Sequence, residues 1–162
     1  MSFQGIFGKP RKLVTDATKS LCSAINKGEP KSTVKYILMN TVGNRNRDLP
    51  EKISFSEKCI IWLLRLLVPP HTDNEEAADF LRTKIGQNDN TIKWVVVRPS
   101  SLIDEEDVSE YKTHSSPTRS AIFNDGKVSR VNVAAFMNKL ITDQNLWEKW
   151  KGQMPVIYNK EK

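Results

Sequence analysis

The chain of 162 residues contains two histidines, His71 and His114. Imidazole is the side chain that most readily gives or accepts a proton near neutral pH, so His71 is a candidate proton donor, while His114 is a candidate ligand-facing residue. His71 follows two prolines and precedes Thr72-Asp73-Asn74-Glu75, which fits the capping-box pattern of a helix start. Each histidine can equally be an ordinary loop residue, and Glu75 can be simply the acid of the capping box.

The two cysteines and the acidic run at 104–107 do not have the residue spacing of a metal site. Cys22 and Cys59 are expected on apolar helical faces, and neither belongs to a Cys-x-x-Cys pair. We interpret them as free thiols in a reducing compartment, which favours a cytoplasmic location. The four consecutive acids at 104–107 are typical of a solvated polar loop. The sequence therefore predicts no bound metal.

Composition and charge limit the classes of partner. The chain carries 25 basic and 19 acidic residues, a formal charge of +6, and 38% of its residues are hydrophobic. That balance is typical of a globular domain rather than a disordered chain. The basic residues are dispersed, with the densest run at 9–12, which disfavours nucleic acid. The most apolar run, 59–68, is interrupted by Arg65 and is too short to span a bilayer, so we expect a buried helix there and no membrane partner.

Periodicity places these residues on alternating helices and strands. Short apolar, β-prone runs at 34–39 and 92–97 predict two buried strands, and 155–158 predicts a last one. Helical spacing predicts a first helix that starts near Pro10 and stops at Gly28, and a second from Ser56 to Pro69-Pro70. Further helices are predicted from the Thr72 capping box to Gly86, from Ser129 or Asn132 to about 141, and over a short segment opened by Asn145. Helices between apolar strands favour parallel pairing within one α/β domain over residues 1–162.

The order of these pieces carries a family resemblance. Trp94-Val95-Val96-Val97-Arg98-Pro99-Ser100-Ser101-Leu102 resembles the W-x-x-x-R-P-x-x-L segment of atypical short-chain dehydrogenase/reductases, including NmrA-like NAD(P)-binding relatives. The segment 129–134, Ser-Arg-Val-Asn-Val-Ala, resembles their S-R-x-D-V-A helix start, with Asn132 in place of the usual Asp. The resemblance covers residues 34–158.

The resemblance implies a partial Rossmann-like, doubly wound sheet of about three mainly parallel strands with flanking helices. The family's glycine-rich G-x-x-G-x-x-G turn, which binds the cofactor pyrophosphate, has no counterpart here; Gly5 and Gly8 form the nearest pair. We therefore expect the C-terminal half of the domain, with the N-terminal half missing. The strand at 34–40 would then be an open sheet edge, prone to self-association or to pairing with the missing half.

The resemblance also assigns site residues and a cofactor, NAD(P), whose binding by this chain alone is doubtful without the glycine-rich turn. Cofactor-contacting positions at the strand ends would be Asn40, Thr41, Pro99, Ser100, Ser101 and Leu102. The family's catalytic Tyr-x-x-x-Lys pair falls on His71 and Glu75. A carboxylate raises the pKa of a neighbouring acid, so Glu75 cannot do the lysine's electrostatic work.

Three hypotheses of function follow. In the first, the chain is part of an NAD(P)-dependent oxidoreductase that acts on a small organic substrate. In the second, it is a non-catalytic nucleotide-sensing or protein-interaction module on the same scaffold. Arg98 would support the loop after its strand or bind an anionic ligand. The third hypothesis, a nucleic-acid binder, rests on net charge alone.

Overall fold

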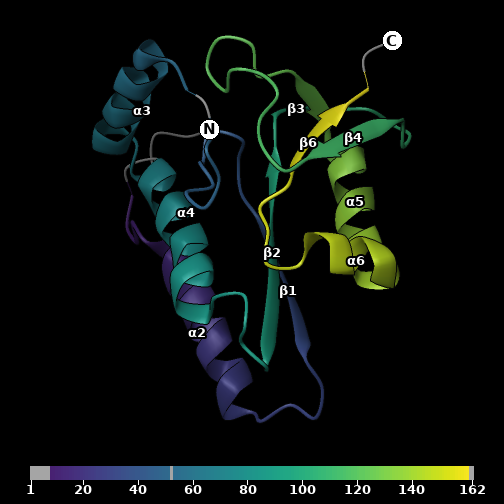
Figure 1. The fold of residues 1–162 in the computed structure, drawn as a ribbon. Coiled ribbons are helices and arrows are strands. Elements are labelled where there is room, and N and C mark those ends of the chain that lie inside the picture. Colours follow the sequence, from purple (N-terminus) through teal and green to yellow (C-terminus); the bar gives the residue numbers. More distant parts are fainter. Residues whose placement is uncertain (1–7, 52, 161–162) are drawn as a thin grey trace. The chain divides into compact units, whose positions relative to one another are not determined.

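The computed structural model describes residues 8–51 and 53–160 (Figure 1). Gly5, the first glycine of the pair noted above, lies outside these residues. The chain divides into two compact units: one comprises Met1–Val34 and Lys52–Lys93, and the other comprises Lys35–Glu51 and Trp94–Lys162. The single domain over residues 1–162 stays a prediction.

The first unit is helical. It contains α2 (Leu13–Lys27), α3 (Phe55–Leu67), α4 (Pro69–Phe80) and the π-helix η1 (Leu81–Ile85). The predicted starts of α3 and α4 were wrong, whereas the predicted stops at Pro69-Pro70 and at Gly86 are confirmed. The capping box belongs to α3: the Ser54 side chain accepts from the Glu57 amide, and the Glu57 carboxylate accepts from the Ser54 amide. Pro69 and Pro70 begin α4 rather than only ending α3, because proline lacks the N–H that the first turn leaves unbonded.

A carboxylate on α4 caps the N-terminus of α2. Lys12, the N-cap residue of α2, has no side-chain capping bond. Instead the two carboxylate oxygens of Asp73 accept hydrogen bonds from the backbone N–H groups of Val14 and Thr15, at 2.8 and 2.9 Å. The Thr15 hydroxyl donates to the Asp73 carbonyl at 2.9 Å. The buried Asp73 therefore satisfies orphan amides of a helix 58 residues away and fixes α2 to α4.

The second unit contains the sheet. Its strand order is β1 (Val34–Met39), β2 (Ile92–Pro99), β6 (Val156–Asn159) and β4 (Tyr111–His114). The amides of Asn40 and Val42 donate to the carbonyls of Val97 and Pro99, so residue numbers rise together along β1 and β2, as in a parallel pair. The β2–β6 pair is parallel and the β4–β6 pair is antiparallel.

The predicted sheet of about three mainly parallel strands is confirmed, with β1 as its edge strand as expected. Three short strands were not predicted. They are β4 and the parallel pair of β3 (Ser101–Ile103) with β5 (Lys127–Ser129). These strands have three or four residues each, too few for an alternation of polar and apolar side chains to be recognised, so periodicity could not find them.

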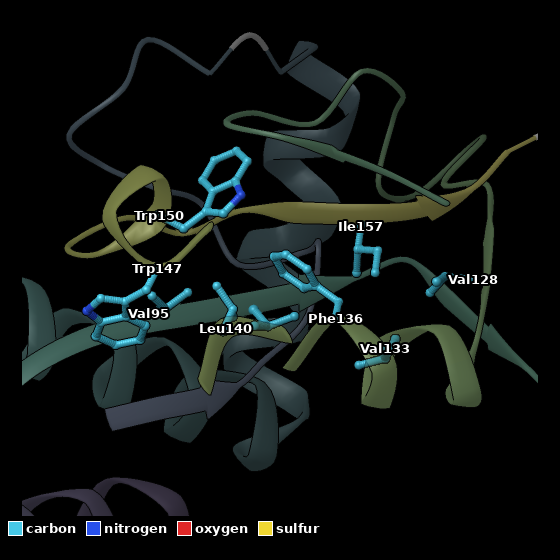
Figure 2. Close-up of a cluster of buried hydrophobic side chains, with 9 residues drawn as sticks. Val95, Val128, Val133, Phe136, Leu140, Trp147, Trp150 and Ile157 are labelled. Atoms are coloured by element: carbon cyan, nitrogen blue, oxygen red, sulfur yellow. The ribbon is translucent and has the colours of Figure 1, made fainter. Parts of the chain in front are cut away.

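Helices α5 (Arg130–Thr142) and α6 (Gln144–Trp150) pack on the sheet of this unit. Figure 2 shows apolar side chains of both helices gathered against the strands. The cluster consists of Val95, Val97, Val128, Val133, Phe136, Leu140, Trp147, Trp150 and Ile157. Ser129 is confirmed as the N-cap of α5, whereas Asp143, not Asn145, caps α6.

The expected burial of the apolar run 59–68 was wrong. Within α3 only Glu57 and Ile61 are buried, while Trp62 and Leu66 are 64% and 66% exposed. Within the described ranges, no helix has the length and hydropathy that crossing a bilayer requires.

A buried ion pair ties four segments of the second unit together. Arg98, on β2, is fully buried, and its guanidinium forms a two-point pair with Glu51 at 2.7 and 3.2 Å. Its remaining N–H groups donate to the backbone carbonyls of Asn44, Ser115 and Met154, at 2.8, 3.1 and 2.7 Å. All five donors of the guanidinium are therefore used. Of the two roles proposed for Arg98, loop support fits the structure and anion binding does not.

We predict that Arg98→Met lowers the free energy of unfolding by about 3–5 kcal/mol, because the substitution leaves the Glu51 carboxylate buried without its partner. Urea denaturation followed by tryptophan fluorescence measures this change. The matched control is Arg130→Met, since Arg130 pairs with Asp104 on the surface, where both side chains are more than half exposed. Equal effects of the two substitutions would contradict a special role for the buried pair.

Candidate functional site

Six of the eight predicted site residues lie in the second unit, where β1 and β2 end. The bond from the Val42 amide to the Pro99 carbonyl, 2.9 Å, holds the two strand exits side by side. Asn40, Thr41, Pro99 and Ser100 therefore lie in one neighbourhood, and Ser101 and Leu102 continue from it into β3. This is the carboxyl edge of a parallel sheet, where α/β proteins bind their ligands.

Asn40 and Thr41 mainly shape the turn after β1. The Asn40 side-chain oxygen accepts from the Thr41 amide at 2.9 Å and from the Asn44 side-chain amide at 2.8 Å. The Thr41 hydroxyl accepts from the Gly43 amide at the longer distance of 3.4 Å. Asn40 is therefore committed to the turn, while the half-buried Thr41 hydroxyl keeps its own proton free to donate.

The segment from Pro99 to Leu102 offers fewer backbone donors than expected. Pro99 has no N–H, and the Ser100 amide donates to the Ile157 carbonyl at 3.3 Å. Ser101 and Leu102 belong to β3, whose backbone pairs with β5. The Ser101 hydroxyl donates to the Asp125 carboxylate at 2.5 Å. Leu102 is 38% exposed and presents an apolar side chain next to these groups.

The Ser100 hydroxyl is the unusual group of this neighbourhood. Ser100 is 5% exposed, and its Oγ has no hydrogen-bond partner within residues 8–51 and 53–160. A buried hydroxyl without a partner costs about 1–3 kcal/mol, so its presence at the strand ends points to a role other than stability. No sequence signal distinguishes Ser100 from Ser101, because the difference is one of burial.

His71 and Glu75, the remaining two predicted residues, lie in the first unit on successive turns of α4. The His71 Nε2 and Glu75 Oε1 atoms are 3.7 Å apart, beyond hydrogen-bond distance. Glu75 instead accepts two hydrogen bonds from Arg65 of α3, at 2.7 and 2.8 Å. Its carboxylate is therefore an ion-pair partner that fixes α3 to α4 and not the acid of a capping box.

Burial lowers the pKa of His71, and Arg65 lowers it further, while Glu75 opposes both. The His71 Nε2 is buried, with no hydrogen-bond partner in the described part of the chain. The imidazole is therefore held neutral over the range in which a free histidine would gain its proton. A neutral, enclosed imidazole is poorly suited to donate a proton to a substrate.

The Ser129–Asn132 motif has a structural explanation. The Asn132 side chain is fully buried; its oxygen accepts from the Ser109 amide at 2.9 Å, and its nitrogen donates to Asn159 at 2.7 Å. Asn159 accepts in turn from the Ser129 amide at 3.0 Å. This network links the start of α5 to β6 and to the loop before β4. The asparagine amide can donate as well as accept, which a carboxylate in this position could not.

We predict that stability falls with acidity through His71. The folded pKa of His71 is lowered, so the unfolded chain binds the proton more tightly. The contribution is complete above the unfolded pKa, about 6.5, and is lost as the pH falls below it toward the folded pKa. Urea unfolding at pH 7.5, 6.5 and 5.5 measures the loss, which should be smaller in His71→Gln. Identical pH profiles for the two proteins would contradict this account.

Comparison with known proteins gives no match to a family model and none to a curated protein. Solved structures do match. A protein described as an NAD-dependent epimerase/dehydratase, from Bacillus halodurans, has a TM-score of 0.56 and 19% identity; the match covers 90% of this chain and 53% of that one. The oxidoreductase ylbE from Lactococcus lactis has a TM-score of 0.60 and 16% identity, with coverages of 95% and 58%.

A third match was solved in complex with NADP. It is a short-chain dehydrogenase/reductase from Veillonella parvula, with a TM-score of 0.58 and 16% identity, covering 90% of this chain and 58% of that one. The chain thus spans little more than half the length of these structures. Identities at this level establish a shared architecture. The chain has part of a Rossmann-like α/β fold, as found in NAD(P)-binding oxidoreductases.

Proposed function

We propose that this chain is part of an NAD(P)-binding protein of the short-chain dehydrogenase/reductase type, and that its strand-end neighbourhood faces the nicotinamide end of the cofactor. The observation that carries the proposal is the orphaned, buried hydroxyl of Ser100 at the carboxyl edge of the parallel sheet. The shared fold, including one neighbour solved with NADP, supports the choice of cofactor.

The residues of the neighbourhood fit a nicotinamide. The Ser100 and Thr41 hydroxyls can bond a carboxamide, and the exposed Leu102 side chain can pack on an apolar ring face. When bound, the cofactor supplies hydride transfer; the protein's part is to orient the ring and to exclude water from it. Within residues 8–51 and 53–160 no glycine-rich turn forms a pyrophosphate site. We therefore propose contacts with the nicotinamide end of the cofactor alone.

A second candidate function is a nucleotide-sensing or interaction module without catalysis. It is favoured by the state of the two residues at the positions of the family's catalytic pair. His71 is held neutral by burial, and Glu75 is committed to Arg65. Neither arrangement provides a proton donor supported by a neighbouring cation. For both candidates we propose a cytoplasmic location, in keeping with the free thiols of Cys22 and Cys59.

We predict opposite effects of Ser100→Ala on stability and on binding. Removing an unpartnered buried hydroxyl should raise the free energy of unfolding by roughly 1 kcal/mol, whereas losing a bond to the carboxamide should weaken NADPH binding about fivefold. Urea denaturation and calorimetric titration with NADPH measure the two effects. Ser115→Ala, at an exposed serine of the same unit, is the control and should change neither quantity. Failure of the unaltered chain to bind NADPH, or binding that Ser100→Ala leaves unchanged, would contradict the assignment.

A measurement of catalytic turnover distinguishes the two candidate functions. Given the state of His71, we expect NADPH binding without oxidation of NADPH when carbonyl substrates are added, as measured by absorbance at the nicotinamide band. Oxidation that disappears in His71→Ala would instead establish an oxidoreductase with His71 as its proton donor. Oxidation that survives the substitution would place the proton donor elsewhere in the chain.

A further inference from the structure

The outward face of α3 is a continuous apolar stripe. Five of its large hydrophobic side chains are exposed, from 47% for Leu63 to 81% for Phe55; the five are Phe55, Trp62, Leu63, Leu66 and Leu67. Cys59 is exposed on the same helix. Scattered exposed apolar residues are normal, but a contiguous set on one helix marks an interaction site.

The spacing of the stripe is that of a helix–helix seam. Phe55, Cys59, Trp62 and Leu66 follow one another at intervals of four, three and four residues, which is the alternation of the apolar positions in a coiled coil. Leu63 and Leu67 widen the seam on one side. Such a pattern fits the side chains of a second helix better than an irregular surface.

The base of α3 is fixed, so the stripe is presented on a rigid support. Ser54 and Glu57 form a complete capping box at its first turn. Near its other end, Arg65 is paired with Glu75 of α4, and the Thr72 hydroxyl donates to the Arg65 carbonyl at 3.1 Å. Ile61 is buried on the opposite side of the helix from the seam. Little conformational entropy would be lost when a partner binds such a helix.

The area of the stripe is sufficient for a symmetric dimer. With about 200 Å² for an aromatic side chain and roughly 100 Å² for a leucine, the exposed fractions give about 450 Å² of apolar surface per chain. Two copies would bury about 900 Å² of it. Since homodimer interfaces are about 65% apolar, this corresponds to a total interface of about 1,400 Å², within the range of stable complexes.

The charges of the helix favour a second copy over an anionic bilayer. An interfacial helix carries several free basic residues beside its apolar face. On α3 the cations are Lys58 and Arg65, and Arg65 is neutralised by its two-point pair with Glu75. The seam positions themselves carry no charge, so two copies of the stripe meet without repulsion. We propose that this stripe, with the seam Phe55, Cys59, Trp62 and Leu66 at its centre, is the contact between two copies of this chain, formed by pairing of their α3 helices.

The test is the oligomeric state of the whole chain in solution. Size-exclusion chromatography with light scattering should give a mass near twice the 18.5 kDa of one chain at micromolar concentration. Trp62→Glu should weaken the dimer at least tenfold and leave the far-ultraviolet circular dichroism unchanged, because Trp62 is mostly exposed. Leu21→Glu, at a 53% exposed leucine of α2, is the matched control and should leave the dimer intact.

Cys59 provides an independent readout, because Cys22 is buried and only Cys59 is exposed. A short bismaleimide should cross-link two chains, and the product should be absent in Cys59→Ser and in Trp62→Glu. A monomer at all concentrations, or a dimer that survives Trp62→Glu, would overturn the proposal. A dimer that is lost in Met39→Lys instead would assign the contact to the β1 edge. If the unaltered chain is a monomer and binds vesicles that contain phosphatidylserine, the stripe would be assigned to a membrane surface.

Discussion

The second unit depends on the buried pair of Arg98 and Glu51. A guanidinium without solvent must place each of its five N–H groups on an acceptor, or the desolvation cost is not offset. Arg98 does so by binding the loop after β1, the loop after β4 and the segment before β6 at the C-terminal end of β2. The positions of the strand ends, and hence of Ser100 and Thr41, follow from this arrangement. A positive charge in the core thus acts as a geometric constraint on the candidate site.

The first unit uses a carboxylate for the same purpose. Asp73 caps α2 from α4, and Glu75, one turn away from His71, binds Arg65 of α3. Three helices are therefore joined through two acids on one helix. One result is that α3 is held firmly by its polar side while its apolar side stays exposed. The Glu75–Arg65 pair that stabilises this unit thus also leaves the seam of α3 exposed.

These hydrogen bonds and ion pairs determine which polar side chains remain available for function. The arginine after the Trp94–Val97 run, the asparagine at the end of β1 and the acid on α4 all have structural partners. The groups left without such partners in the described residues include the Ser100 hydroxyl and the His71 Nε2. The first lies at a sheet edge suited to ligand binding and supports a cofactor role. The second is buried and its pKa is lowered, which argues against its use as a proton donor.

The sequence alone determined the order of the helices and of β1, β2 and β6, the parallel core of the sheet and β1 as its edge, because apolar periodicity and β-propensity are local properties. It also determined the resemblance to dehydrogenases, through the order of the motifs around Arg98 and Asn132. Only the tertiary structure decided that Glu51 pairs with Arg98, 47 residues away, that Asp73 caps α2, and that the apolar face of α3 is exposed rather than buried. Periodicity shows that a helix has an apolar face, but it carries no information about which surface covers that face. Likewise a carboxylate in the sequence shows no preference among distant partners, since that choice depends on how the chain brings them together.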